Sequence, residues 1–98
     1  MTVQVVGVVD VKDKDTFGKY LEVAAKAVEK HGGRVAQRGA PGDGVLEDTG
    51  AASSAVFVLL EFPSAENAHG WINDPELKPV HELRRGGANT TIRIITPL

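Results

Sequence analysis

Residues 55–62 have the sequence A-V-F-V-L-L-E-F, the most apolar stretch in this chain of 98 residues. Its apolar side chains fall on both of the alternating faces that a strand presents, and Glu61 is the one exception. This pattern is typical of a strand that is buried on both sides and flanked by other strands in a sheet. Pro63 and Ser64 follow directly, and Ser64 is a favoured N-cap, so the sequence predicts that a helix begins here.

A second stretch of the same kind lies near the N-terminus. Residues 3–11, V-Q-V-V-G-V-V-D-V, place valine at both odd and even positions, so we expect a second central strand. Residues 34–38 and 90–96 instead alternate polar with apolar side chains, as edge strands do. In the first of these edge strands, the alternation predicts that Val35 and Gln37 face the same way.

The segments between the strands predict helices and one long connection. Residues 13–30 carry apolar side chains at helical spacing on one face and charged side chains on the other. A second helix is expected from Ser64 to the Asp-Pro pair at 74–75, followed by a short helical segment over residues 75–85. Residues 39–54 are rich in glycine and predict an exposed connection, with Val45 and Leu46 continuing as a strand.

The resulting order of elements is β-α-β-β-α-β, within a single domain over residues 1–98. Two central and two edge strands fit a four-stranded antiparallel sheet in the order 4-1-3-2. This is the ferredoxin-like α+β fold, in which both helices lie on one face of the sheet. Two helices cover only that face, yet the central strands are apolar on both faces. The sequence therefore predicts a partner on the other face, and the simplest partner is a second copy in a homodimer.

Composition excludes several classes of protein. Hydrophobic residues make up 42% of the chain and charged residues 24%, as in ordinary globular domains. The net charge is −2, and the central strands lack the stacking aromatic residues of RNA-binding sheets, so no nucleic-acid partner is expected. No apolar run approaches the roughly 20 residues that span a membrane, and no signal-peptide pattern is present, so a cytoplasmic location is expected.

Several motifs together resemble one family. H-G-G-R at residues 31–34 is followed by Arg38 and by V-L-E at 45–47. L-E-F-P-S-A-E-N-A-H-G-W then occupies residues 60–71, and D-P-E-L precedes Arg84. These motifs run through nearly the whole chain and resemble a family of short bacterial domains of unknown function in the dimeric α/β-barrel superfamily.

The resemblance implies a homodimer whose two sheets form a barrel-like core, and it implies no particular reaction. Leu77 and Phe17 stand where the family usually has tyrosine, so roles that depend on those hydroxyl groups are not expected here. Relatives elsewhere in the superfamily include cofactor-free monooxygenases, haem-handling enzymes and muconolactone isomerases. That range shows why the fold alone does not assign a function.

Two residues are candidates for acid–base catalysis. Glu61 lies within the most apolar strand, where a carboxylate is costly unless it is paired. It is either an ion-paired residue at the border of the sheet, with Arg34, Arg38 or Arg93 as partner, or a general base. His81 lies three residues before Arg84 on one face of the short helical segment, and it is either a surface residue or a catalytic acid–base.

Four residues are candidates for ligand binding: Tyr20, Arg38, Trp71 and Arg84. Tyr20 and Trp71 lie beside the apolar faces of the two helices, where an aromatic ring packs in the core and its polar tip can reach a pocket. Arg84 either stabilises the end of a helix or, as the resemblance implies, binds the carboxylate of a ligand through two parallel hydrogen bonds.

No metal or cofactor site is expected. The chain lacks cysteine, and its three histidines lack the spacing of a metal site, nor does any feature support haem. Two functions remain open: a homodimer that binds or transforms a small organic acid without a cofactor, and a non-catalytic module for dimerisation or ligand binding. A closed pocket with converging polar groups would favour the first of these, and a collapsed apolar core the second.

Overall fold

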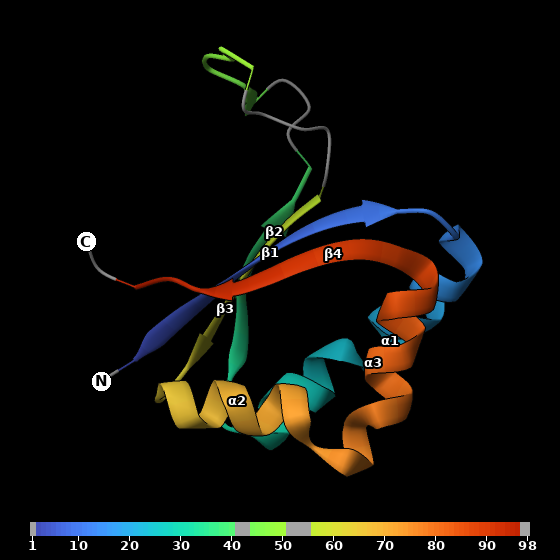
Figure 1. The fold of residues 1–98 in the computed structure, drawn as a ribbon, viewed down its shortest axis with the longest axis vertical. Coiled ribbons are helices and arrows are strands. Elements are labelled where there is room, and N and C mark those ends of the chain that lie inside the picture. Colours follow the sequence, from blue (N-terminus) through green and yellow to red (C-terminus); the bar gives the residue numbers. More distant parts are fainter. Residues whose placement is uncertain (1, 41–43, 51–55, 97–98) are drawn as a thin grey trace.

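A computed structural model describes residues 2–40, 44–50 and 56–96 (Figure 1). The polar and apolar patterns produce the expected order of elements with one addition, a 3₁₀ turn before the last helix. The elements are β1 (Val3–Val11), α1 (Lys14–Lys30), β2 (Arg34–Gly39), β3 (Val56–Phe62), α2 (Ala65–Asn73), η2 (Pro75–Leu77), α3 (Lys78–Gly87) and β4 (Ala88–Ile94).

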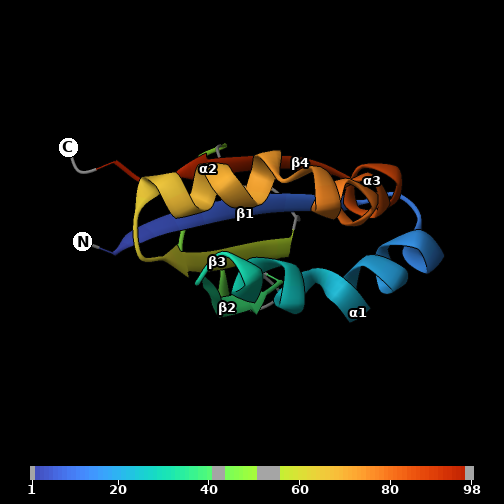
Figure 2. The same ribbon diagram turned by 90° about the horizontal axis from the view of Figure 1, so that it is seen from below.

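The four strands form one antiparallel sheet in the order β2-β3-β1-β4, which confirms the predicted ferredoxin-like α+β fold. All three α-helices lie on one side of the sheet (Figure 1). Figure 2 shows the strands side by side, with α2 along β1 and β4 and with α1 along β3 and β2. We call the side under the helices the covered face and the other side the open face.

Capping residues define where the helices begin and end, and Ser64 caps α2 as the sequence predicts. Asp13 caps α1 by accepting hydrogen bonds from the backbone N–H groups of Asp15 and Thr16, and Ser64 caps α2 through the N–H of Asn67. Gly32 ends α1 with a φ of 78°, in the left-handed region that favours glycine.

The covered face holds the core. Alternate residues of β1 and β3 point into it and pack against the helices. The main buried cluster consists of Val5, Ala27, Val28, Leu60, Phe62, Ala68, Trp71 and Leu77. A smaller cluster of Val9, Phe17 and Ala88 lies toward the start of α1.

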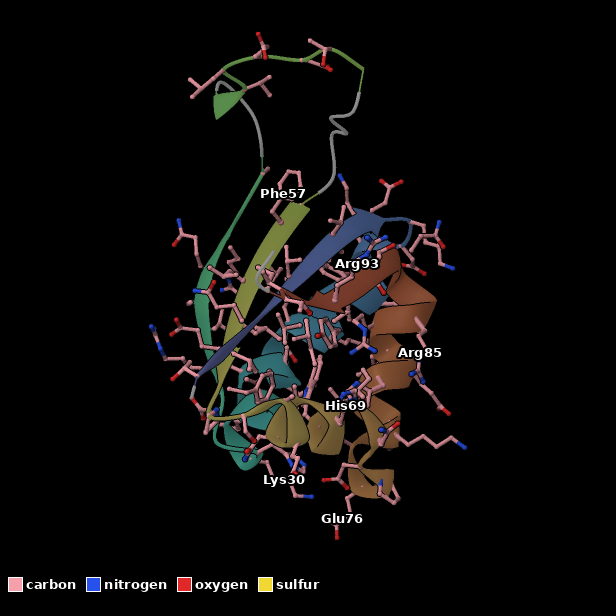
Figure 3. The ribbon with its side chains drawn as sticks, turned by 60° about the vertical axis from the view of Figure 1, so that its left-hand side comes forward. Lys30, Phe57, His69, Glu76, Arg85 and Arg93 are labelled. Carbon is pink, nitrogen blue, oxygen red and sulfur yellow. The ribbon has the colours of Figure 1, made fainter. Side chains whose placement is uncertain are left out.

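The open face carries an apolar patch at its centre, which we call the open patch. It consists of Val6 and Val8 on β1, which lie opposite Leu59 and Phe57 on β3. Phe57 is 40% exposed, and Figure 3 shows it at the start of β3. None of the three α-helices covers this patch, because all of them lie on the other side of the sheet. None of the described helices is long and apolar enough to cross a membrane.

One prediction about β2 is wrong, and the correction matters for the site. A β-bulge shifts the register between Val35 and Gln37, so Val35 lies opposite Leu60 whereas Gln37 lies opposite Leu59. The two residues therefore occupy opposite faces. The bulge inserts one extra residue and turns the end of the strand over, which places Arg38 on the covered face.

Two further boundaries differ from the prediction. Val45 and Leu46 are not in a strand, because the pairing of β2 with β3 ends at Gly39 opposite Phe57. Leu46 is 99% exposed. The last strand begins at Ala88 rather than at residue 90, because its first residues already pair with the end of β1.

Candidate functional site

A cavity of about 60 Å³ lies between the covered face and the helices. Its walls are mostly apolar and come from the middle of β1, β3 and β4 and from α1. The lining residues that carry polar side-chain groups are the four ligand-binding candidates, Tyr20, Arg38, Trp71 and Arg84. The structure therefore brings together four residues that are far apart in the sequence.

Arg84 is the polar residue that lies deepest in this site. It comes from α3 and is only 3% exposed. Its guanidinium carbon lies 5.7 Å from the ring centres of both Tyr20 and Trp71, so it is held beside two aromatic rings. Among the described residues, no carboxylate lies within ion-pair distance of Arg84, and its Nε has no hydrogen-bond partner.

The side chain of His81 is hydrogen-bonded to that of Arg84. Its side chain is 2% exposed and does not line the cavity. Its Nε2 lies 2.9 Å from the backbone oxygen of Trp71 and must donate to it, because that oxygen only accepts. Its Nδ1 then accepts from Nη1 of Arg84 at 2.7 Å, so the ring is neutral in this arrangement.

The environment of His81 agrees with that assignment. Burial lowers the pKa of His81, and the positive charges of Arg84 and Arg85 lower it further, whereas its hydrogen bond to Trp71 acts the other way. Both ring nitrogens are occupied by protein partners. In this geometry His81 has no free nitrogen with which to take a proton from a ligand.

Trp71 forms one wall of the cavity and carries a second polar atom without a partner. Its ring packs against Phe62 at 5.7 Å and meets His81 edge-on at 5.2 Å. Its indole Nε1 is buried and has no acceptor among the described residues. Buried N–H groups almost always have a partner, whereas this atom and Nε of Arg84 have none among the described residues.

Tyr20 and Arg38 lie closer to the surface. Tyr20 packs its ring against Phe17 at 5.5 Å and covers one side of Arg84. Arg38 is exposed and reaches the cavity because of the bulge in β2. Leu21, which is 44% exposed, also lines the cavity, so the cavity meets solvent on the side of α1 and β2.

Glu61 lies on the other side of the sheet from this cavity. It makes an ion pair with Arg34, which is one of the three partners expected from the sequence. It also accepts a long hydrogen bond of 3.5 Å from the Nε2 of Gln4. These contacts place Glu61 at the border of the open patch and not at the site.

A separate polar cluster ties the end of α1 to the turn before α3. Lys30 and His31 both contact Asp74 at 2.8 Å, and Lys30 also contacts Glu76 at 2.9 Å. Lys30 and Glu76 lie at the same end of the molecule in Figure 3. The hydrogen bond from Lys30, followed by that from His31, lowers the pKa of Asp74. This cluster is structural in its contacts, because Asp74 also caps η2.

The remaining sequence expectations concern metals and the third histidine. His69 is exposed on α2. Within residues 2–40, 44–50 and 56–96, no group of three or more histidine or acidic side chains is placed to hold a metal ion.

Sequence reasoning did not single out Gly7, which lines the cavity, although a glycine in the middle of a valine-rich strand is an unusual feature.

Comparison with known proteins gives a family and a set of similar folds. The model of a family described as "Domain of unknown function (DUF1330)" matches residues 2–98. This confirms the resemblance to a family of domains of unknown function. No curated protein matches the sequence significantly.

Solved structures share the fold at low sequence identity. A protein of unknown function from Rhodopseudomonas palustris has a TM-score of 0.73 and 17% identity, over 99% of this chain and 82% of that one. SnoaB, a cofactor-independent oxygenase from Streptomyces nogalater, has a TM-score of 0.69 and 11% identity, over 99% and 93%. A protein from Arabidopsis thaliana has a TM-score of 0.67 and 13% identity, over 98% and 95%.

Proposed function

The chain belongs to the DUF1330 family of domains of unknown function, and we propose that it binds a small organic acid in the cavity between its sheet and its helices. The guanidinium group of Arg84 carries this proposal, because it is buried without a carboxylate beside it among the described residues. A buried charge is costly unless it is paired, and a carboxylate ligand would provide the pair.

The other atoms of the cavity support the same class of ligand. Nε1 of Trp71 is a second buried donor without an acceptor among the described residues, and Trp71 lines the cavity together with Arg84. A carboxylate would supply the acceptor that Nε of Arg84 lacks, because arginine binds such a group through parallel hydrogen bonds. Valine, leucine and isoleucine form most of the remaining wall, so the ligand has an apolar portion.

We assign His81 the role of positioning Arg84. The hydrogen bond that Nε2 of His81 donates to the backbone oxygen of Trp71 fixes the tautomer of His81, and Nδ1 of His81 then accepts from Nη1 of Arg84. This leaves the other edge of Arg84, with its free Nε, for the ligand. Glu61 has no part in the proposed site, because it pairs with Arg34 on the open face.

Calorimetric titration of the full chain with sodium pentanoate tests the proposal. Arg84→Gln should weaken binding about tenfold or more, because a hydrogen bond to a charged group contributes roughly 1.5–3 kcal/mol. Arg84→Lys should also lose affinity, because lysine cannot reproduce the planar fork of arginine. Arg85→Gln is the matched control, since Arg85 is exposed and points away from the sheet (Figure 3).

Two outcomes would overturn the proposal. The first is that the unaltered protein binds no pentanoate at millimolar concentration. The second is that Arg84→Gln binds pentanoate as well as Arg85→Gln does. In either case the unpaired guanidinium would not be a carboxylate site.

We also propose that the open patch forms the interface of a homodimer. Val6, Val8, Phe57 and Leu59 make an apolar surface that no described helix covers, and ion-paired Glu61 and Arg34 lie beside it. An apolar centre with a polar rim is the usual composition of an interface. Light scattering after size-exclusion chromatography should give twice the mass of 10.4 kDa, and a stable monomer at micromolar concentration would contradict this proposal.

An enzyme without a cofactor is the second candidate, and one observation favours it. The unpartnered Nε of Arg84 would stabilise the negative charge that develops on the carboxylate when hydroxide from solvent removes an α-proton and becomes water. If so, the α-protons of bound pentanoate should exchange with deuterium from heavy water faster with the protein than without it, as followed by proton NMR. Unchanged exchange at saturating protein would leave binding alone as the function.

A further inference from the structure

Gly7 occupies the middle of a central strand, in a place where glycine has no structural purpose. It lies on the covered face of β1, directly opposite Val58 on β3 and Ile92 on β4. Glycine in a strand interior costs roughly 0.5–1 kcal/mol relative to alanine, so its presence calls for a reason. In strands it usually accompanies a bulge, a tight bend, or the close approach of a ligand or of another backbone. The backbone atom nearest to a Cβ at Gly7 is the oxygen of Val58 at 4.0 Å, which is an ordinary contact.

The structure excludes the first two reasons. The pairing of β1 with β3 and with β4 runs through Gly7 without a shift in register, so there is no bulge. Its φ is not positive, so the backbone does not require glycine. A Cβ at this position would meet Val58 Cβ at 3.8 Å and Ile92 Cγ1 at 3.9 Å, which are ordinary contacts. Alanine would therefore fit this position without strain.

Because Gly7 has no side chain, space remains over it in the cavity. Gly7 lines the cavity together with Arg84, Val58 and Ile92. The two contact distances show that the space over Gly7 is about as wide as one carbon atom, with a side chain on each side. A chain of single carbon width, or the edge of a flat ring, fits there, whereas a branched carbon would meet Val58 or Ile92.

We propose that Gly7 is the specificity-determining residue of this cavity, and that the acid bound there has an unbranched or flat apolar body lying over Gly7 between Val58 and Ile92. The inference rests on the proposed binding of an acid at Arg84. It adds the class of acid that the site accepts, and it explains why a stabilising side chain is absent from the centre of the sheet.

Three isomeric acids of five carbons provide the test, because they share charge and composition and differ only in branching. Titration of the full chain should show that pentanoate binds about tenfold or more tightly than 3-methylbutanoate or 2,2-dimethylpropanoate, as expected for overpacking in a filled site. Gly7→Ala should weaken the binding of pentanoate by a similar factor, because its methyl group fills the space that the chain would take. The same variant should unfold at a higher temperature than the unaltered protein when no acid is present.

Gly18→Ala is the matched control. A Cβ at Gly18 on α1 meets no atom within 4 Å, so this variant should stabilise the helix without touching the cavity. Its preference for pentanoate over the branched isomers should equal that of the unaltered protein. Ile92→Ala is the opposite change, since it removes the Cγ1 atom on one side of the space and should reduce the preference for pentanoate.

The outcomes separate this inference from the proposed function. If pentanoate binds and Arg84→Gln abolishes binding, but the branched acids bind equally well or Gly7→Ala has no effect, the role of Gly7 is wrong and the carboxylate site stands. If Gly7→Ala lowers the unfolding temperature or fails to fold, the glycine is structural, and the inference is overturned. If none of the three acids binds, the proposed function fails and takes the inference with it.

Discussion

The two faces of the sheet have nearly the same pattern of apolar residues in the sequence, but their surroundings in the structure differ. On the covered face, Val5, Leu60 and Phe62 are at most 7% exposed and pack against the helices. On the open face, their neighbours along the same strands include Phe57, which is 40% exposed, and Val6. A run of apolar residues on both faces therefore indicates that both faces become covered, but it does not indicate by what.

Polar groups distinguish the faces more sharply than apolar ones do. The covered face holds Arg84 and His81, which are buried and bonded to each other. The open face holds Glu61 and Arg34, which pair at the edge of the open patch, where Arg34 is mostly exposed. A buried charge without an opposite charge suits a ligand site, whereas a paired charge at the border suits an interface.

The largest expected effect comes from placing a charge on each face in turn. Val5→Asp buries an unpaired carboxylate in the core at a cost of several kcal/mol, which is a large part of the roughly 5–15 kcal/mol that stabilises a domain. We expect this variant to lose its fold, as measured by circular dichroism and thermal unfolding. Val6→Asp, one residue later on the open face, should keep the fold and yield a monomer in light scattering.

The pair of variants tests the comparison itself. Leu59→Asp should repeat the result of Val6→Asp, because the two residues face each other across β1 and β3. If the open-face variants unfold as completely as Val5→Asp does, the open patch belongs to a core that the monomer needs. If they stay dimeric, the interface lies elsewhere.

Much of this fold could be predicted from the sequence because its determinants are local and periodic. Valine on both faces identified the central strands, and Ser64 identified the start of α2. The bulge in β2 could not be predicted, because R-V-A-Q-R-G alternates regularly and the shift appears only when β2 pairs with β3. The position of Arg38 at the cavity follows from that shift.

Four of the candidate residues, Tyr20, Arg38, Trp71 and Arg84, line one cavity, but the sequence did not predict the hydrogen bonds around them. Helical spacing placed His81 and Arg84 on one face, three residues apart, as the structure has them. The sequence did not show that Trp71 fixes one nitrogen of His81 through its backbone oxygen, because that contact joins α2 to α3 across the turn at η2. The roles of these residues toward a ligand stay predictions.

The next largest effect concerns the pH dependence of stability on the covered face. Burial holds the pKa of folded His81 below its ordinary value of 6.5, so between those two values the unfolded chain binds a proton that the folded chain does not. Stability should therefore be complete above about pH 6.5 and should decline as the pH falls below it. Urea unfolding at pH 7.5 and at pH 5.5 measures the decline.

Substitution identifies the group responsible. His81→Asn should lower stability at pH 7.5 and flatten the dependence between the two pH values. His69→Asn is the control, because His69 is exposed and should leave the profile unchanged. A profile that His81→Asn does not alter would contradict the neutral, hydrogen-bonded arrangement.

A smaller effect is expected at the surface end of the cavity. Arg38 is exposed, so its attraction for an anionic ligand is screened by solvent and contributes roughly 0.2–1 kcal/mol. Arg38→Gln should weaken pentanoate binding by at most about fivefold, and the loss should shrink between 20 and about 500 mM salt, since salt screens exposed charges. A loss as large as that of Arg84→Gln would place the ligand carboxylate at Arg38 instead.

The smallest effect, and the finest test of the comparison, lies in the ion pair between Glu61 and Arg34. In a monomer this pair is partly solvated, because the side chain of Arg34 is 66% exposed, and such pairs contribute roughly 0–1 kcal/mol. In the proposed dimer the partner covers the open patch and excludes water from the pair, which strengthens the attraction between the two charges.

A double-mutant cycle with Glu61→Gln and Arg34→Gln measures the coupling energy from urea unfolding. The coupling should be small when the cycle is built on Val6→Asp, which is expected to be monomeric, and larger in the unaltered protein. Equal coupling in both backgrounds would mean that the pair lies outside the interface and that the second copy covers less of the open face than we propose.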